Sequence, residues 1–282
     1  MKAPTFIAEL SANHLGDLKR AHALIDAAAD AGADMIKLQT YTPEQMVSPD
    51  KIITDGPWAG QFAMDLYRKA HTPRAWHREL FDHALGRDMM PFSTPFHPDD
   101  VAFLQSLNCG MYKISSFELT DTDLINAAAA TGKPLIMSTG MATLDEINQA
   151  VYAARSVCMG HVYLLKCTSA YPAKIADANL RTMDILKRIC NGVGLSDHTL
   201  GHTVAMTATA LGAMFIEKHL TLSRMDGGPD ADFSMEPHEF AHMVNACTQV
   251  AEAIGNIQFG PTKDEEPSLQ LRRQPGKMRA EG

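Results

Sequence analysis

The sequence predicts an α/β protein with a (β/α)8 TIM barrel, and three observations support this fold class. Strand-like and helix-like segments alternate along the chain. Eight such repeats occupy roughly the first 255 residues, the usual size of such a barrel. Polar residues collect where the predicted strands end. A doubly wound sheet would alternate in the same way, but it typically carries a glycine-rich phosphate loop after its first strand, and the stretch 11–16 has a single glycine.

The predicted strands are short apolar runs that end in polar residues. They are expected at 6–10, 34–40, 89–95, 111–115, 134–138, 162–167, 194–198 and 213–219. Apolar residues at helical spacing lie between and after them. Helices are expected at 17–31, 74–87, 99–107, 119–130, after an N-cap at Thr143, between residues 202 and 213, and at 236–254.

The second predicted strand places two polar side chains on one face. Lys37 and Gln39 are two residues apart and share a face, because side chains alternate along a strand. A cation and an amide are costly in an apolar core, so an edge strand is one explanation, and a barrel interior near its open end fits better. The segment 41–72 that follows, with Pro57 and Trp58, is predicted to be a long irregular loop with a function.

The composition excludes several classes of protein. The 282 residues carry a formal net charge of -8, with a pI near 5.8, whereas a nucleic-acid-binding protein normally shows a basic footprint. No apolar run approaches the roughly 18 residues of a membrane span, and no signal peptide is recognised at the N-terminus. The five cysteines form no CxxC pair. We therefore expect reduced thiols in a cytoplasmic protein that binds neither nucleic acid nor membrane.

Polar residues near the C-terminal strand ends form the predicted site, because this face carries the active site in such barrels. They are Glu9, Lys37, Gln39, Thr94, Lys113, Ser116, Glu118, Ser138, Ser169, Tyr171, Ser196, His198 and His219. Two lysines and several hydroxyls suit a small, multiply charged anion such as a phosphate-carboxylate. The alternative is that the lysines merely pair with Glu9 and Glu118, which leaves the hydroxyls without a role.

Two histidines end the last two predicted strands. His198 and His219 are separated by one helical segment, and parallel strands joined in this way end on the same face. The imidazoles are therefore expected to converge, which suits a metal ion with open coordination positions. The alternative is that they are two unrelated polar residues in surface loops.

Eight short motifs occur in one unbroken order within residues 5–255. They are Ala8-Glu9-Leu10-Ser11-Ala12-Asn13-His14, Lys37-Leu38-Gln39-Thr40, Ser93-Thr94-Pro95-Phe96, Tyr112-Lys113-Ile114, Ser138-Thr139-Gly140-Met141, Cys167-Thr168-Ser169-Ala170-Tyr171-Pro172, Gly194-Leu195-Ser196-Asp197-His198 and Ile216-Glu217-Lys218-His219. Together they resemble the sialic acid synthase family. The resemblance implies a TIM-barrel transferase that condenses phosphoenolpyruvate with an N-acetylated amino sugar, with a divalent metal (Mn²⁺ or Mg²⁺), to give a nonulosonic acid and phosphate.

The resemblance also implies roles for individual residues. The metal would be held by His198 and His219. Phosphoenolpyruvate would be bound by Lys37, Thr94, Lys113, Ser116, Ser138, Ser169 and Ser196. The sugar would face Glu118, Tyr171 and Asp230, with Gln39 also touching substrate. Glu9 would lie near the metal and the reacting aldehyde, so the expected catalytic residues are Glu9, Lys37, Lys113 and Asp230. The family resemblance also implies a homodimer.

One branch of the family is the most similar. The run Leu66-Tyr67-Arg68-Lys69-Ala70-His71-Thr72-Pro73 and the pair Trp76-His77 look most like pseudaminic acid synthases. Ser169 fits the same branch, since the N-acetylneuraminate branch tends to carry asparagine there. The resemblance leaves the sugar and the native metal open.

The C-terminal part departs from the family pattern. Residues 1–258 are predicted to form the barrel, and the polar residues 259–282 a linker-like tail. The family usually continues into an antifreeze-like domain that lends an arginine to the sugar across a dimer, and we expect this domain to be lacking unless another chain supplies it. Two alternatives to the synthase follow: a non-catalytic sugar- or anion-binding barrel without its lid, and another phosphoenolpyruvate aldol enzyme acting on a sugar phosphate, which would need additional arginines.

Overall fold

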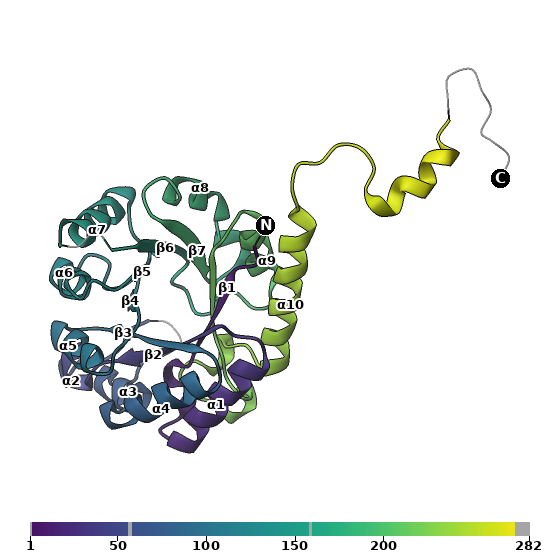
Figure 1. The fold of residues 1–282 in the computed structure, drawn as a ribbon. Coiled ribbons are helices and arrows are strands. Elements are labelled where there is room, and N and C mark those ends of the chain that lie inside the picture. The colour runs from purple at the N-terminus through teal and green to yellow at the C-terminus, as the bar shows by residue number, and fades with distance from the viewer. Residues whose placement is uncertain (1, 56–57, 158–159, 274–282) are drawn as a thin grey trace.

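The computed structural model describes residues 2–55, 58–157 and 160–273. Pro57, Cys158 and the tail residues 274–282, which entered the predictions, lie outside the described residues. Figure 1 shows a ring of strands surrounded by helices, with a tail that leaves the ring after α10. The strands are β1 (Thr5–Glu9), β2 (Met35–Thr40), β3 (Met90–Pro95), β4 (Tyr112–Ile114), β5 (Leu135–Ser138), β6 (Val162–Cys167), β7 (Gly192–Ser196) and β8 (Phe215–His219).

Helices follow the strands in turn. They are α1 (Leu18–Asp30), α2 (Pro43–Met46), α3 (Ala63–Ala70), α4 (Arg74–Gly86), α5 (Pro98–Ser106), α6 (Thr122–Ala130), α7 (Leu144–Val157), α8 (Met183–Leu186), α9 (Thr203–Ala210) and α10 (Pro237–Ile254). The strands pair in parallel in their chain order, and β8 pairs with β1, so the sheet closes. The predicted (β/α)8 barrel is confirmed.

Two details of the prediction are wrong. The segment 41–72 is not wholly irregular, because it contains α2 and α3. The helix expected from residue 119 begins at Thr122, since the Asp121 side chain accepts a hydrogen bond from the backbone N–H of Leu124 at 2.9 Å and thereby caps the helix there. The predicted N-cap at Thr143 is present, with its hydroxyl accepting from the N–H of Glu146 at 3.3 Å.

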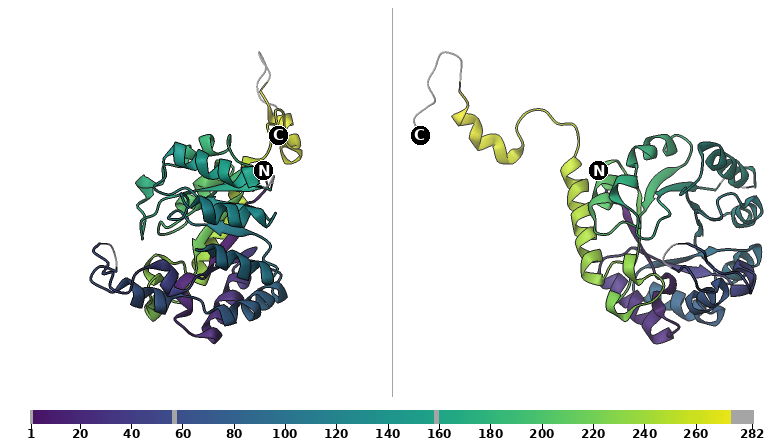
Figure 2. Two further views of the ribbon diagram at one scale, coloured as in Figure 1. Left: turned by 90° about the vertical axis from the view of Figure 1, so that its left-hand side faces the viewer. Right: turned by 180° about the vertical axis from the view of Figure 1, so that it is seen from behind.

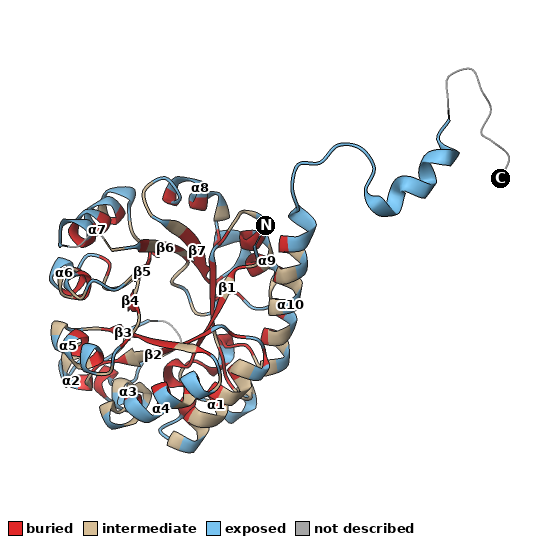
Figure 3. Cartoon of the chain, viewed as in Figure 1, coloured by how far each residue is buried: buried red, intermediate tan, exposed pale blue. Residues whose placement is uncertain are grey.

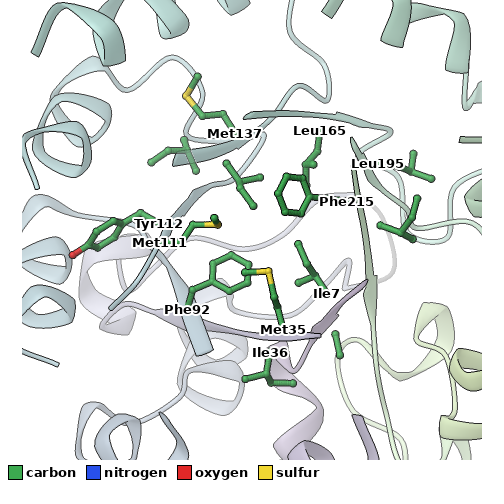
Figure 4. Packing of buried hydrophobic residues seen from close by; sticks show 14 of the residues in the cluster. Ile7, Met35, Ile36, Phe92, Met111, Tyr112, Met137, Leu165, Leu195 and Phe215 are labelled. Atoms are coloured by element: carbon green, nitrogen blue, oxygen red, sulfur yellow. The ribbon is translucent and has the colours of Figure 1, made fainter. Parts of the chain in front are cut away.

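Alternation along the strands divides the core into two layers. In Figure 4, Ile7, Met35, Phe92 and Phe215 meet inside the barrel, whereas other strand residues point outward to the helices, such as Ile36, Tyr112, Met137 and Leu195. Gly194 of β7 faces the interior, where a Cβ atom would lie 2.6 Å from the Phe215 carbonyl oxygen. The glycine therefore lets β8 and its large aromatic residue approach closely. The bulky apolar layer forms a floor beneath the polar strand ends.

The outer helices cover the barrel with apolar stripes. In α1 the buried residues are Ala21, Leu24, Ile25 and Ala28, which recur at helical spacing. The helix begins after Asp17, whose side chain accepts from the N–H of Lys19 at 2.8 Å. None of the helices in the described part of the chain combines the length and apolar character that a membrane span needs.

The tail leaves the barrel beyond α10, as both views in Figure 2 show. It contains a 3-10 helix, Lys263–Leu271, where the sequence predicted only a linker or flexible tail. Its described residues are exposed, in contrast to the buried strands (Figure 3). The predicted boundary between residues 258 and 259 stays a prediction. Cys109, Cys167, Cys190 and Cys247 are free thiols.

Candidate active site

The C-terminal strand ends surround a small polar cavity of about 60 Å³, which we call the inner chamber. Every strand, or the turn just after it, contributes to its wall. The predicted site residues that line it are Glu9, Lys37, Gln39, Thr94, Lys113, Ser116, Ser138, Tyr171, Ser196, His198 and His219. The sequence pattern therefore identified most of this wall.

The parallel register explains why these side chains meet. Glu9 of β1 pairs with Lys37 of β2 on one side and with His219 of β8 on the other. Gln39 pairs with Thr94 of β3. Residues opposite each other in a parallel sheet point to the same face, and all strands end at the same rim of the barrel. Polar residues that are distant in the sequence are thereby brought to one level.

Two buried lysines share one buried carboxylate in this chamber. Lys37 Nζ lies 3.1 Å from Glu217 Oε2 and also contacts Glu9, and Lys113 Nζ lies 3.4 Å from Glu217 Oε1. Ser196 donates a hydrogen bond to Glu217 Oε1 at 2.9 Å. Burial lowers the pKa of Lys37 to about 7, with Glu217 opposing and Lys113 adding to the effect. Burial alone would raise the pKa of Glu217, but the two lysines hold it well below its ordinary range.

Glu217 is a site residue that the sequence reasoning missed. It lies two residues before His219 on β8 and is 4% exposed. The alternation that places Lys37 and Gln39 on one face of β2 also places Glu217 beside His219, so the signal was present in the sequence. The alternative in which the two lysines pair with Glu9 and Glu118 therefore needs a change of partner. The carboxylate beside Lys113 is that of Glu217.

Several buried polar atoms of the chamber have no hydrogen-bond partner among the described residues. They are Thr94 Oγ1, Ser138 Oγ, Glu9 Oε1 and His219 Nδ1. Buried polar groups normally have a partner, because an unpaired one retains its full desolvation cost. The chamber wall is therefore incomplete by itself and suited to a polar ligand.

Gly140 allows two serines to approach each other at this wall. A Cβ atom at Gly140 would lie 2.8 Å from Ser116 Oγ and closer still to Ser169 Oγ. The Gly140 N–H donates to Ser116 Oγ at 3.0 Å. Ser169 is not among the described residues that line the chamber, and its hydroxyl is 3.8 Å from Sγ of Cys167, which does line it. Its predicted contact with a substrate stays a prediction.

The two predicted metal ligands face each other, with ring centroids 5.4 Å apart. His198 Nδ1 lies 3.0 Å from the Thr168 carbonyl oxygen, which can only accept a hydrogen bond, so Nδ1 carries a proton. In the neutral ring Nε2 then keeps its lone pair, an arrangement typical of metal-binding histidines. Burial and the neighbouring His198 hold the pKa of His219 well below its ordinary value. Within the described residues, no three His, Cys, Asp or Glu side chains form a ready metal cluster.

Cys167 is a second chamber residue that was not predicted. Its thiol lies 3.9 Å from His198 Nδ1. Burial would raise the pKa of this thiol, but the hydrogen bond and the charge of His198 lower it to about 7. The same pairing raises the pKa of His198 against the effect of burial. The contact depends on the register of β6 and β7, in which Cys167 is opposite Ser196.

A larger cavity of about 630 Å³ opens directly above, and we call it the outer chamber. Six residues line both chambers and mark their junction: Gln39, Phe96, Ser115, Phe117, Tyr171 and His219. The two remaining predicted sugar contacts, Glu118 and Asp230, line the outer chamber only. The small, polar inner chamber therefore opens into the wide outer chamber at His219, which ends β8.

Of the two carboxyl groups in the outer chamber, Asp230 is buried and Glu118 is half-buried, and they differ in their contacts. Glu118 accepts a hydrogen bond from Ser115 Oγ, and Asp230 Oδ2 accepts from the N–H of Ala12 at 3.2 Å. Asp230 Oδ2 also lies 3.8 Å from His219 Nδ1. Burial raises the pKa of both carboxyl groups, although these hydrogen bonds oppose the effect. Both groups therefore hold a proton more readily than an exposed carboxyl group does.

A buried ion pair supports the two histidines from outside the chamber. Lys218 and Asp197 each stand next to one histidine in the sequence, and Lys218 Nζ lies 2.9 Å from Asp197 Oδ2. Lys218 also donates to the carbonyl oxygens of Thr199 and of Gly201, the latter at 3.1 Å. Asp197 Oδ1 accepts from both the N–H and the hydroxyl of Thr199. These contacts join the end of β8 to the loop that carries His198.

Comparisons with known proteins agree with this geometry. A family model described as the NeuB family matches residues 24–259. A pseudaminic acid synthase from Helicobacter pylori is 46% identical over 95% of this chain and 78% of its own length. An N,N'-diacetyllegionaminic acid synthase from Campylobacter jejuni is 36% identical over 97% and 84%, respectively. The crystal structure of an N-acetylneuraminic acid synthetase from Leptospira borgpetersenii, in complex with citrate, has a TM-score of 0.86 and 31% identity, covering 95% of this chain and 90% of that one.

Proposed function

The chain belongs to the NeuB family, and we propose that it is a synthase that condenses phosphoenolpyruvate with an N-acetylated amino sugar. The products are a nonulosonic acid and phosphate. The observation that carries this proposal is the inner chamber, in which two buried lysines stand beside the unpartnered hydroxyls of Thr94 and Ser138. Phosphoenolpyruvate is small and carries both a phosphate and a carboxylate, and it would supply the missing acceptors.

The charges of the inner chamber support a divalent cation as part of the site. The lysines Lys37 and Lys113 are balanced by the carboxylates Glu9 and Glu217, so these four side chains give no net positive charge for an anion. A divalent ion held by His198 Nε2 and His219 would make the chamber positive. The two imidazoles fit such an ion, with coordination positions left for substrate and water. We therefore propose Mn²⁺ or Mg²⁺, which when bound would polarise the aldehyde oxygen and lower the pKa of a bound water.

The protein side chains would then hold the two substrates in attack geometry. Lys37 and Lys113 would bind the phosphate and carboxylate of phosphoenolpyruvate, with C3 directed to the junction of the chambers. The sugar would lie in the outer chamber with its open-chain aldehyde at this junction. A bond forms between C3 and the aldehyde carbon, and water adds to C2. The C2–O bond to phosphate then breaks as the new C2 hydroxyl becomes a carbonyl, and the proton of that hydroxyl leaves with the phosphate.

Two carboxyl groups are positioned for the proton transfers that this reaction needs. The aldehyde oxygen gains a proton as it becomes a hydroxyl, and the water that adds to C2 loses one. Asp230, whose pKa burial raises, stands beside His219 at the outer side of the junction and would give the first proton. Glu9 Oε1, which has no partner among the described residues, would accept the second on the inner side.

The two alternative functions have less support. A pure binding barrel has no need of paired histidines beside two carboxyl groups. An aldol enzyme for sugar phosphates would need a second cationic pocket, and the described residues that line the outer chamber include Lys51 but no arginine. The similarity to pseudaminic acid synthases leads us to propose that branch. The homodimer and the cytoplasmic location stay predictions.

The direct test is phosphate release from phosphoenolpyruvate with a panel of N-acetylated amino sugars. We expect release that requires both the sugar and a divalent ion, that stops with a chelator, and that returns when Mn²⁺ or Mg²⁺ is added in excess. Calorimetry on the same preparation measures binding of phosphoenolpyruvate. Tight binding without phosphate release from any sugar in the panel would favour the binding barrel and overturn the proposal.

A further inference from the structure

Two loops at the C-terminal rim of the barrel are joined beside Asp230, the proposed proton donor. One is the turn after β1, a short 3-10 helix (Ser11–His14) whose four residues are all buried. The other is the loop between β8 and α10, which carries Asp230. The fully buried side chain of Asn13 lies where the two loops meet. Asn13 has no role in the proposed metal and anion sites.

A single amide nitrogen connects the two ends of the β8–α10 loop. Asn13 Nδ2 donates to the Leu220 carbonyl oxygen and to Ser234 Oγ, at 2.9 Å in each case. A carbonyl oxygen only accepts hydrogen bonds, so the Asn13 atom that faces Leu220 must be the nitrogen. Both N–H donors of the amide are thereby used. Because Leu220 directly follows His219, the amide reaches from the end of β8 to the far side of the loop.

Ser234 extends this contact to Asp230. Its hydroxyl accepts the hydrogen bond from Asn13 and donates its own to the Asp230 carbonyl oxygen at 2.5 Å. The Asp230 carboxylate is held from the same turn, since its Oδ2 accepts from the N–H of Ala12 at 3.2 Å. The turn after β1 therefore holds Asp230 at two points, the main chain and the side chain.

These contacts set the spacing between Asp230 and His219. Asp230 Oδ2 lies 3.8 Å from His219 Nδ1, and the Asn13 amide is bonded on both sides of this gap. Arg20 joins the same two loops a second time. Its Nε donates to the Asn13 carbonyl oxygen at 2.8 Å, and its Nη1 lies 2.7 Å from Asp226 Oδ2. The β8–α10 loop is thus fixed to the turn both before and after Asp230.

We propose that Asn13 and Ser234 are positioning residues, which hold the Asp230 carboxyl group at the junction for proton transfer to the aldehyde oxygen. Such a transfer requires the two groups to come within hydrogen-bond reach, and a misplacement of about 1 Å can lower a rate about 100-fold. Aspartate in place of Asn13 would have no N–H donor for the two oxygens. The inference rests on the proposed function, in which Asp230 gives this proton.

The test is a double-mutant cycle between Ser234→Ala and Asp230→Asn. Ser234→Ala removes one oxygen atom and leaves Asn13 bonded to Leu220. It should lower kcat about ten-fold, with the KM for phosphoenolpyruvate and the bound Mn²⁺ unchanged. Asp230→Asn alone should lower kcat by about 100-fold or more, the contribution of a general acid. In that background Ser234→Ala should have little further effect on kcat, because the group that it positions is already inactive.

Thr209→Val is the matched control. Thr209 is fully buried in α9, its hydroxyl donates to the Ala205 carbonyl oxygen at 2.9 Å, and it is not among the described residues that line either chamber. The variant also deletes a buried hydroxyl, and it should lower the free energy of unfolding in urea without lowering kcat. Asn13→Ala, which removes both donors, should lower kcat more than Ser234→Ala does. If Ser234→Ala does not fold, Ser234→Cys, which keeps a weak donor, replaces it in the same cycle.

Three results would overturn the inference: no loss of kcat with Ser234→Ala, the same fold loss with and without Asp230→Asn, or an equal loss with Thr209→Val. Failure of the proposed function gives a different signature, namely no phosphate release from any sugar with the unmodified protein. Hydrogen exchange then tests the contact itself. Ser234→Ala should speed exchange of the Ala12 N–H, which is bonded to Asp230, and Thr209→Val should not. Unchanged exchange would show that Ser234 does not position Asp230.

Discussion

Strand β8 carries two neighbouring buried charges that face opposite ways. Glu217 points into the barrel, where it contacts Lys37 and Lys113. Lys218 points outward, where it contacts Asp197 and two carbonyl oxygens of the β7–α9 loop. Both clusters are almost inaccessible to solvent, so burial alone does not distinguish a functional cluster from a structural one.

The clusters differ in how completely their polar atoms are paired. In the outer cluster, which is Lys218 with Asp197 and the loop carbonyl oxygens, Lys218 has three acceptors for its three donors. Asp197 also accepts two hydrogen bonds from Thr199. The inner cluster, which is Glu217 with Lys37 and Lys113, stands beside polar atoms that have no partner among the described residues. These atoms belong to Thr94, Ser138 and Glu9. A complete network is expected to contribute to folding, and an incomplete one to be completed by a ligand. Substitutions in the two clusters should therefore affect different measurements.

Lys113→Met should have the largest effect, and it should act on binding. A desolvated anion left without its cation costs about 3–5 kcal/mol, which corresponds to a loss of more than 100-fold in affinity for phosphoenolpyruvate. The fold should tolerate the change, because Glu217 keeps Lys37 and Ser196 as partners. Calorimetry measures the affinity and urea unfolding measures the stability. Unchanged affinity would contradict the assignment of the inner cluster to the anion.

His198→Ala and His219→Ala should reduce kcat/KM by about 100- to 1,000-fold, the cost of losing one electrostatic contact to developing charge. Each variant should also lose bound Mn²⁺ in equilibrium dialysis, which separates a metal ligand from a residue that only packs. His202→Ala is the matched control, because His202 packs against His242 rather than lining either chamber. Full metal content in both active-site variants would reject the metal site.

The sequence predicted the barrel because its signals are local and repeated. Strand ends were found to within two residues or so, since apolar runs and turn residues mark them. The helix α3 was missed because a helix of eight residues has little stability of its own and depends on packing by residues such as Ala63 and Met64. Its position over the outer chamber follows from tertiary contacts, which a sequence pattern does not contain.

The candidate site was predicted well where one residue type at a strand end was sufficient evidence. The lysines, the histidines and the predicted hydroxyl residues other than Ser169 line the inner chamber as the pattern indicated. Glu217 was missed because the motif that ends in His219 was interpreted by its histidine alone, although alternation would have included the glutamate. Cys167 was a different kind of omission, since its contact with His198 depends on the register between two strands.

Lys218→Met should affect stability rather than binding. It leaves Asp197 buried without its cation, and we expect the free energy of unfolding to fall by about 3 kcal/mol, near the lower end for a broken buried pair because Thr199 still donates to Asp197. Urea unfolding measures this loss. The double variant Asp197→Leu with Lys218→Met should recover part of it, since no unpaired charge remains. If Lys218→Met lowered the free energy of unfolding as little as Lys113→Met is expected to, the distinction between the two clusters would be lost.

A third buried network, around His77, extends the comparison to pH. His77 Nε2 lies 2.8 Å from Thr40 Oγ1 and Nδ1 lies 3.1 Å from the Pro73 carbonyl oxygen, so both ring nitrogens are paired, as in the outer cluster. Burial lowers the pKa of His77 to about 4, whereas an unfolded histidine titrates near pH 6.5. The unfolded state therefore binds a proton first as the pH falls.

The His77 contribution to stability is complete above pH 6.5 and is lost as the pH falls from there towards 4. At pH 5 the loss should be about 2 kcal/mol, since one pKa unit corresponds to roughly 1.4 kcal/mol. His77→Gln keeps a donor and an acceptor but cannot titrate. Between pH 7 and pH 5, the unfolding free energy of this variant should therefore fall by about 2 kcal/mol less than that of the unmodified protein. Its kcat/KM at pH 7 should stay close to that of the unmodified enzyme. Equal losses for the two proteins would show that His77 does not titrate as a buried neutral group, and a large loss of activity at pH 7 would show that a fully paired network can still belong to the site.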